Sequence, residues 1–238
     1  MTRALRSTHH TPPTSNRELD EILSVVSHDL RSPLSALSVA IDALAEPDMD
    51  AATRDRYLAA MRRSIQRAER FLNDLIDVSR MDAGSFAVDP EPVGVAALLE
   101  DVAKQHEAAA HEAGNWFVLE IADGVDRVRA DRARVLQALD ALVMNALRYA
   151  RGTGVVTLRA ELARGAVRLW VIDHGPGLPR GEVDQVFDRP WRRRDERRAG
   201  NGLGLVLARG IAEAHGGAAR AVSASGQGAA FYLELPAQ

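Results

Sequence analysis

The chain has 238 residues, of which 46% are hydrophobic and 26% charged, and its net charge is −3. This composition predicts a globular protein of one or two domains and excludes a global attraction to nucleic acid or membrane surfaces. The absence of cysteine excludes disulfides and thiol nucleophiles. The sequence has no apolar run near the roughly 20 residues that span a bilayer, and its N-terminus lacks the apolar segment of a secretory signal, so we expect a cytoplasmic protein.

The N-terminal third predicts a flexible arm followed by a helical hairpin. Residues 1–15 are polar and contain two prolines. Apolar residues then recur at spacings of three and four up to Leu44, and a second stripe follows from about Asp50. We place the hairpin at residues 16–82. Because a lone hairpin cannot bury both stripes, we expect an all-α dimeric four-helix bundle; the alternative is a hairpin packed on its own chain.

Beyond the hairpin, the sequence predicts a linker and a second domain. The linker, AGSFAVDPEP, covers residues 83–92, and the domain covers residues 93–236. Helices are expected at 93–113, 130–151 and 203–214, and strands at 116–121, 155–162, 166–172, 219–223 and 230–235. Mostly antiparallel strands mixed with helices predict an α+β sandwich with its helices on one sheet face.

The segment SVVSHDLRSPLSAL, residues 24–37, places polar residues and Pro33 inside the first predicted helix. At about 100° per residue, His28 lies roughly 160° from the centre of the apolar stripe and is expected to face solvent. A neutral imidazole is a competent nucleophile near pH 7, and the carboxylate of Asp29 could accept the ring proton. Pro33 leaves the carbonyl of Asp29 without its usual helical donor.

Three more motifs stand in the second domain: LDALVMNALRYA (139–150), VIDHGPGLP (171–179) and GNGLGLVLARGIAEAHGG (200–217). The glycines of the third motif precede a helix, whose N-terminal amides suit phosphate. Asp173 ends an apolar strand, where it either pairs with a ligand or caps a turn. Asn145 offers a hard oxygen ligand suited to Mg²⁺; the alternative is a solvated polar face.

Together with SHDLRSPL, in this order and spacing, these motifs resemble the sensor histidine kinases of bacterial two-component systems over about residues 18–236. The resemblance implies a phosphoacceptor hairpin followed by a Bergerat-type α+β sandwich that binds ATP and Mg²⁺. It implies His28 as phosphoacceptor, Asp29 as general base, Asn145 as magnesium ligand and Asp173 as acceptor for the adenine amino group. The other implied nucleotide-binding residues are Arg148, Tyr149, Gly175, Gly177, Arg193, Gly200, Gly202, Leu203, Gly204 and Leu205.

Between the glycine motifs lies the segment VFDRPWRRRDERRAG, residues 186–200. Phe187 and Trp191 stand beside five arginines, and the resemblance implies a mobile lid whose arginines reach the phosphates. A solvated loop is the alternative. No metal other than magnesium is expected, and His215 is expected at a helix end, where a cation is favourable.

Three residues depart from the family pattern. Ala141 stands where many relatives carry a second Asn, and His174 stands where Asn is common. Ser32 lies four residues after His28, where relatives that also dephosphorylate their partner carry Thr or Asn. Its hydroxyl could orient a water, so Ser32 is the candidate for a phosphatase-type role.

The resemblance implies that ATP phosphorylates His28 and that the phosphoryl group passes to an aspartate of a response-regulator receiver domain. A separate sensor protein is a further expected partner, and nucleic acid is not. Two alternatives stay open. One is a scaffold with a weakened ATP site, motivated by Ala141; the other is an ATPase of the gyrase or mismatch-repair type, which would leave the hairpin unexplained.

Overall fold

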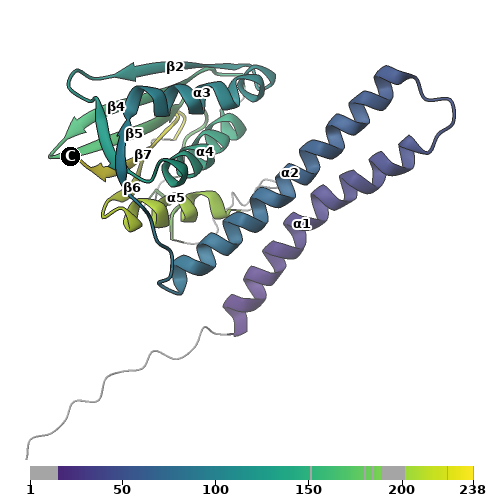
Figure 1. The fold of residues 1–238 in the computed structure, drawn as a ribbon, viewed down its shortest axis with the longest axis horizontal. Helices are drawn as coiled ribbons and strands as arrows, with labels where there is room; N and C mark the ends of the chain where they lie inside the picture. Colours follow the sequence, from purple (N-terminus) through teal and green to yellow (C-terminus); the bar gives the residue numbers. More distant parts are fainter. Residues whose placement is uncertain are drawn as a thin grey trace, which may run out of the picture. The chain divides into compact units, whose positions relative to one another are not determined.

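The computed structural model describes the backbone of residues 16–150, 152–179, 181–183, 185–188, 202–223 and 225–237, and the side chains from Leu30 onward. Its ribbon is drawn in Figure 1. The chain divides into two compact units, Met1–Glu69 and Arg70–Gln238. The arm expected at residues 1–15 lies outside the described residues.

The predicted helical hairpin is formed by two long helices, and the first unit contains α1 and the larger part of α2. Helix α1 spans Asn16–Leu44 and continues through Pro33, and helix α2 spans Ala51–Asp82. Asp50 begins α2, as predicted, because its Oδ1 accepts a hydrogen bond from the Thr53 amide at 2.9 Å. Hydrogen bonds from Thr53 also lower the pKa of Asp50. Within the described part of the chain, no helix combines the length and the apolar character needed to cross a membrane.

Large apolar side chains of the hairpin remain exposed in the single chain. Leu34 and Ile41 on α1 are 58% and 55% exposed, and Leu58 and Ile65 on α2 are 39% and 45% exposed. All four belong to the stripes that the heptad-like spacing predicts. The apolar faces of the two helices are therefore only partly covered. Such a large exposed apolar surface is unfavourable for a hairpin that is isolated in water.

The second unit contains a five-stranded sheet with the order β2-β4-β5-β7-β6. Its strands are β2 (Asn115–Ile121), β4 (Gly154–Ala163), β5 (Ala166–Asp173), β6 (Ala218–Ser223) and β7 (Ala229–Pro236). Strand β2 pairs with β4 in parallel and the other pairs are antiparallel. Helices α3 (Val95–Glu112), α4 (Arg132–Tyr149) and α5 (Leu203–Ala214) cover one face of the sheet, as Figure 1 shows. The predicted α+β sandwich is confirmed.

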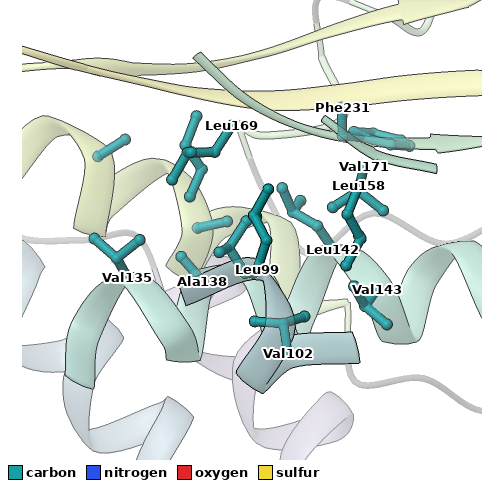
Figure 2. Close-up of a cluster of buried hydrophobic side chains, with 14 of the residues drawn as sticks. Leu99, Val102, Val135, Ala138, Leu142, Val143, Leu158, Leu169, Val171 and Phe231 are labelled. Atoms are coloured by element: carbon teal, nitrogen blue, oxygen red, sulfur yellow. The ribbon is translucent and has the colours of Figure 1, made fainter. Parts of the chain in front are cut away.

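The core lies between this sheet face and the three helices. Along β4 the alternate residues Val156, Leu158 and Ala160 are fully buried, as the two-residue period of a strand requires. Figure 2 shows how Leu99 and Leu142 meet the side chains of the sheet. Burying one large apolar side chain stabilises a fold by about 1.5–3 kcal/mol, so this core holds α4 and the end of β5 firmly.

Two short strands were not predicted. Strand β1 (Glu91–Gly94) pairs antiparallel with β3 (Arg127–Ala130), so the last two residues of the predicted linker belong to a strand. The helix expected from residue 130 begins instead after Asp131, whose Oδ1 accepts a hydrogen bond from the Arg134 amide at 3.2 Å. Four-residue strands are too short to show a period, and their pairing joins distant parts of the sequence.

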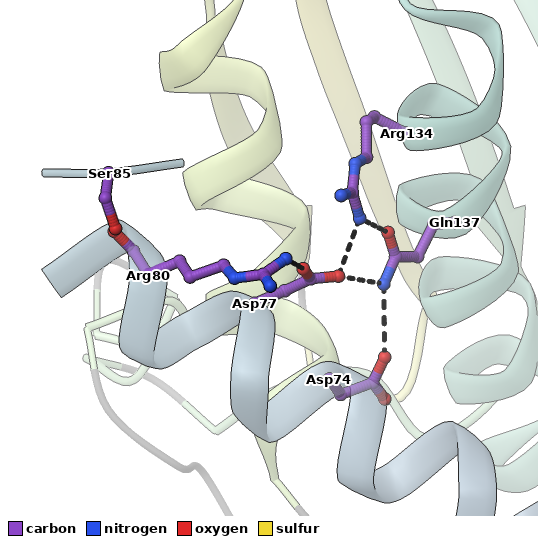
Figure 3. A network of polar contacts seen from close by, with 6 residues as sticks. All are labelled: Asp74, Asp77, Arg80, Ser85, Arg134 and Gln137. Atoms are coloured by element: carbon purple, nitrogen blue, oxygen red, sulfur yellow. Dashed lines mark hydrogen bonds and ion pairs between the residues drawn. The ribbon is translucent and has the colours of Figure 1, made fainter. Parts of the chain in front are cut away.

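The last turns of α2 belong to the second unit, where polar contacts join them to α4. Arg134 Nη1 donates to Asp77 Oδ2 at 2.7 Å, and Gln137 Nε2 donates to the same oxygen at 2.9 Å. Gln137 Nε2 also lies 3.4 Å from Asp74 Oδ1. These four residues, drawn in Figure 3, form what we call the α2–α4 network. Burial, the largest cause, raises the pKa of Asp74 to about 6, whereas the bond from Gln137 opposes that shift.

Apolar packing adds to this attachment. A Cβ atom on Gly210 of α5 would lie within 2.2 Å of Met81 Sδ on α2, so the two helices touch where glycine has no side chain. The Arg134 guanidinium lies 4.8 Å from the centre of the Phe86 ring, just beyond α2. The end of α2 is thus fixed against both α4 and α5.

Candidate functional site

A small pocket opens where the C-terminal half of α4 meets the end of β5. It is lined by two residues of α4, Asp173 at the end of β5, the loop after it and β7; the lining residues are Asn145, Tyr149, Asp173, Gly177, Leu178, Ala229 and Phe231. Four of these are predicted site residues from two motifs that are far apart in the sequence. The fold therefore brings the motifs LDALVMNALRYA and VIDHGPGLP to one place.

Asp173 is buried at this pocket, with only 4% of its surface exposed. Its Oδ1 accepts hydrogen bonds from the amides of Gly175 at 2.8 Å and Ala229 at 3.3 Å. Burial raises the pKa of Asp173, and the two backbone bonds oppose the shift. The structure thus shows Oδ1 capping the turn, and the same carboxyl group lines the pocket. That this carboxyl group pairs with a ligand stays a prediction.

Glycines let the chain pass close to this carboxylate. A Cβ atom on Gly175 would lie 2.9 Å from the Tyr149 carbonyl oxygen and 3.0 Å from Asp173 Oδ1. Gly177 has a φ of +68°, which only glycine adopts readily. A side chain at Gly175 would push the loop away from α4, and one at Gly177 would strain the backbone, so both glycines shape the pocket.

Helix α4 supplies the polar wall of the pocket. Asn145 and Tyr149 are one turn apart and both line it. The Arg148 guanidinium lies 5.9 Å from the Tyr149 ring centre. Ala141, one turn before Asn145, faces the first turn of α5: a Cβ on Gly204 would lie 3.3 Å from Ala141 Cβ. Ala141 therefore serves the close approach of α4 and α5, where a larger side chain would meet Gly204.

The predicted phosphate-binding residues lie partly in the described region. Helix α5 begins at Leu203 after Gly202, whose φ is +66° and which provides no side-chain cap. Leu203 and Leu205 are buried and anchor this turn. Arg193 and Gly200, together with Trp191 and the neighbouring arginines, lie outside the described residues.

The predicted phosphoacceptor segment belongs to the other unit. The backbone of α1 includes His28 and Asp29, but their side chains lie outside the described residues. Ser32 is exposed on α1. The structure thus places these residues on one helix, α1.

His215 lies at a helix end, as predicted, but its contacts do not suit a cation. It is buried at the C-terminus of α5, where Nδ1 lies 2.7 Å from the Ile211 carbonyl oxygen and Nε2 accepts a hydrogen bond from the Asp131 amide at 2.9 Å. A ring nitrogen that accepts from an amide carries no proton, so this geometry requires neutral imidazole. The expectation of a cation there is wrong, because the ring joins α5 to the start of α4.

The chemistry of the donors fits magnesium at Asn145. Its amide oxygen is a hard ligand, and Mg²⁺ commonly takes only one or two protein ligands beside waters and phosphate oxygens. In the described residues no group of three or more His, Cys, Asp or Glu side chains could hold a metal ion. Asn145 would therefore hold such an ion together with a bound phosphate.

Sequence reasoning missed Leu178, Ala229 and Phe231 as pocket residues, and it missed Ser223 beside them. Ala229 contributes a backbone amide, which no side-chain pattern reveals. The glycine pair Gly226 and Gly228 was the available signal, because it marks a tight turn next to these residues.

Two family models match the chain. Residues 18–84 match the His Kinase A (phospho-acceptor) domain, and residues 130–238 match the histidine kinase-, DNA gyrase B-, and HSP90-like ATPase. The chain is 32% identical over 228 residues to the sensor protein kinase WalK of Staphylococcus epidermidis, covering 93% of this chain and 37% of that one. It is 31% identical over 225 residues to the adaptive-response sensory kinase SasA of Synechocystis, covering 91% and 59%.

A solved structure has a similar fold. Full-length ShkA in complex with AMPPNP is 28% identical, with a TM-score of 0.68, over 92% of this chain and 46% of that one. The chain spans well under two thirds of the length of these relatives. The two matched models cover about three quarters of this chain. The chain belongs to the sensor histidine kinases of two-component systems.

Proposed function

We propose that this chain is an ATP-dependent protein-histidine kinase, with a hairpin at 16–82, a linker at 83–92 and a nucleotide-binding domain at 93–236. The observation that carries the proposal is the pocket in which Asn145, Tyr149, Asp173 and Gly177 meet. The AMPPNP held by the similar ShkA structure supports nucleotide as its occupant. Cytoplasmic action is part of the proposal.

Each pocket residue has a distinct task in this scheme. The buried carboxylate of Asp173 accepts a hydrogen bond from the adenine amino group, and Tyr149 borders the nucleotide. Asn145 holds Mg²⁺, which neutralises phosphate charge when bound. Gly202, Leu203, Gly204 and Leu205 place the first turn of α5 toward the phosphates, where its dipole favours negative charge; Arg148, Arg193 and Gly200 complete this set.

The chemical step is transfer of the γ-phosphoryl group to His28. An imidazole nitrogen of His28 attacks the γ-phosphorus, the bond to the β–γ bridging oxygen breaks, and ADP leaves with that electron pair. Asp29 accepts the proton that the ring loses. Transfer from phosphohistidine to an aspartate of a response-regulator receiver domain completes the signalling reaction. Ser32 serves dephosphorylation of the partner: it orients a water that attacks the phosphorus of the phosphoaspartate, the bond to the aspartate oxygen breaks, and inorganic phosphate leaves.

The hairpin supports a homodimer. Leu34, Ile41, Leu58 and Ile65 expose apolar surface in the single chain, and a second copy would cover it in a four-helix bundle. Sedimentation of the intact chain tests this: a dimer is expected for the wild type, and Ile41→Asp is expected to shift it toward monomer. A monomeric wild type at micromolar concentration would overturn the dimer.

Incubation with γ-labelled ATP and Mg²⁺ tests the kinase directly. We expect acid-labile, alkali-stable label in the wild type and none in His28→Gln. His111→Gln is the matched control, because His111 is an exposed histidine on α3, and it should label normally. Label in His28→Gln would refute the site. ATP binding without label would favour a scaffold, and steady phosphate release without phosphohistidine would favour an ATPase of the gyrase type.

A further inference from the structure

The turn between β6 and β7 is bonded to the loop that follows Asp173. The Ser223 hydroxyl accepts a hydrogen bond from the Leu178 amide at 2.8 Å and donates one to the Gly228 carbonyl at 2.7 Å. Nearby, the Gly226 amide donates to the Pro176 carbonyl at 2.8 Å. One hydroxyl thus joins two backbone segments that are far apart in sequence.

Both partners of Ser223 are next to the pocket. Leu178 lines it and is 6% exposed, and Gly228 precedes Ala229, which also lines it. Ser223 itself is not among the lining residues. Removing the hydroxyl would leave the Leu178 amide and the Gly228 carbonyl without this partner, and such groups are costly to leave unpaired near a protein interior.

The same turn holds the carboxylate of Asp173. The Ala229 amide donates to Asp173 Oδ1 at 3.3 Å. A Cβ atom on Gly228 would lie only 2.0 Å from the Asp173 carbonyl oxygen, so the turn lies directly against the end of β5. Displacing Gly228 therefore displaces the donor that orients the Asp173 side chain.

The geometry points to Ser223 as a positioning residue that sets specificity for adenine. Its hydroxyl fixes the β6–β7 turn against the loop 175–178 and so fixes the Asp173 carboxylate in the direction that an exocyclic amino group requires. The inference rests on the proposed function, because it presupposes a nucleotide in the pocket. Ser223 acts through Asp173 and touches no part of the base.

Titration calorimetry of the intact chain with Mg²⁺ and either ATP or inosine triphosphate provides the test. Inosine triphosphate carries a carbonyl in place of the amino group, so an oriented carboxylate should disfavour it. For the wild type we expect tighter binding of ATP by about tenfold or more. In Ser223→Ala we expect ATP affinity to fall by about tenfold. We also expect the ratio of the ATP affinity to the inosine triphosphate affinity to approach one.

Two further variants separate positioning from general support of the fold. Ser223→Thr keeps the hydroxyl and should keep the ratio. Ser225→Ala, in the same turn and exposed, should match the wild type. Ser223→Cys keeps a side chain of similar size but has only a weak hydrogen-bond donor. It should lower the ratio of ATP affinity to inosine triphosphate affinity, and it can be measured even where Ser223→Ala is too unstable.

The outcomes distinguish this inference from the proposed function. If Ser223→Ala and Ser223→Cys weaken both nucleotides equally and keep the wild-type ratio, the hydroxyl only supports the fold and the inference is wrong, while the nucleotide site stands. If the wild type binds neither nucleotide, the proposed function fails, and the inference fails with it. If the wild type binds both equally, Asp173 does not select adenine and the role of Ser223 is refuted.

Discussion

Two aspartates one turn apart on α2 should respond in opposite ways to the same isosteric change. Asp74 is partly buried beside the carboxylates of Asp140 and Asp77, and burial raises its pKa to about 6. The hydrogen bond from Gln137 and the charge of Arg70 only partly offset this. Asp74→Asn removes the charge and keeps an acceptor for Gln137, so we expect this variant to be more stable than the wild type at pH 8.

The size of this stabilisation follows from the difference between a pKa of about 6 in the fold and the ordinary aspartate value of 3.8. At about 1.36 kcal/mol per unit, a shift of roughly two units corresponds to about 3 kcal/mol, which we discount to about 1–2 kcal/mol for a side chain that is not fully buried. Because the folded-state pKa is raised, burial of Asp74 costs little stability below pH 4, where its carboxyl group is protonated. The loss of stability grows as the pH rises toward 6 and stays constant above that.

Asp77→Asn is the matched control. Asp77 is 5% exposed and accepts hydrogen bonds from Arg134 and Gln137. Removing its charge leaves the guanidinium without its counter-ion, and we expect a loss of about 1–3 kcal/mol at pH 8. The same Asp→Asn exchange is thus expected to stabilise the fold at position 74 and to destabilise it at position 77.

Urea unfolding followed by tryptophan fluorescence measures both variants in the intact chain. All three tryptophans, at positions 116, 170 and 191, belong to the second unit, so the signal reports that unit alone. The advantage of Asp74→Asn over the wild type should be largest at pH 8 and small at pH 4. An advantage that does not change with pH, or a loss for both variants at pH 8, would refute the argument from burial.

Three further predictions concern contacts described above. Gly228→Ala should abolish measurable ATP binding in calorimetry, because its Cβ would lie 2.0 Å from the Asp173 carbonyl oxygen; wild-type affinity would contradict that geometry. Gly210→Ala should lower the urea midpoint by forcing α5 away from Met81, and adding Met81→Ala should restore part of the loss; strictly additive effects would mean the two residues do not touch. His215→Ala should lower the stability of the second unit by about 1–3 kcal/mol, because the Asp131 amide loses its acceptor; an unchanged midpoint would argue against the bond.

Sequence patterns predicted the long elements well because their periods report burial directly. Helix α5 begins and ends where its apolar run does, at Leu203 and Ala214. Of the residues that line the pocket, the sequence motifs included the polar ones, Asn145, Tyr149 and Asp173, whereas the apolar Phe231 and the backbone amide of Ala229 were missed. What the sequence could not show are contacts made by the backbone across the fold: the pairing of β1 with β3 and the Ala229 amide on Asp173.

The position of β7 has a consequence for synthesis of the protein. This strand comes after all other strands in the chain, yet it lies between β5 and β6 in the sheet. A nascent chain that has not reached Ala229 lacks an inner strand and one wall of the pocket. The ribosome therefore releases a competent second unit only after nearly all of its sequence has been translated, and premature termination in this region yields a chain with two unpaired strand edges, a form prone to aggregation.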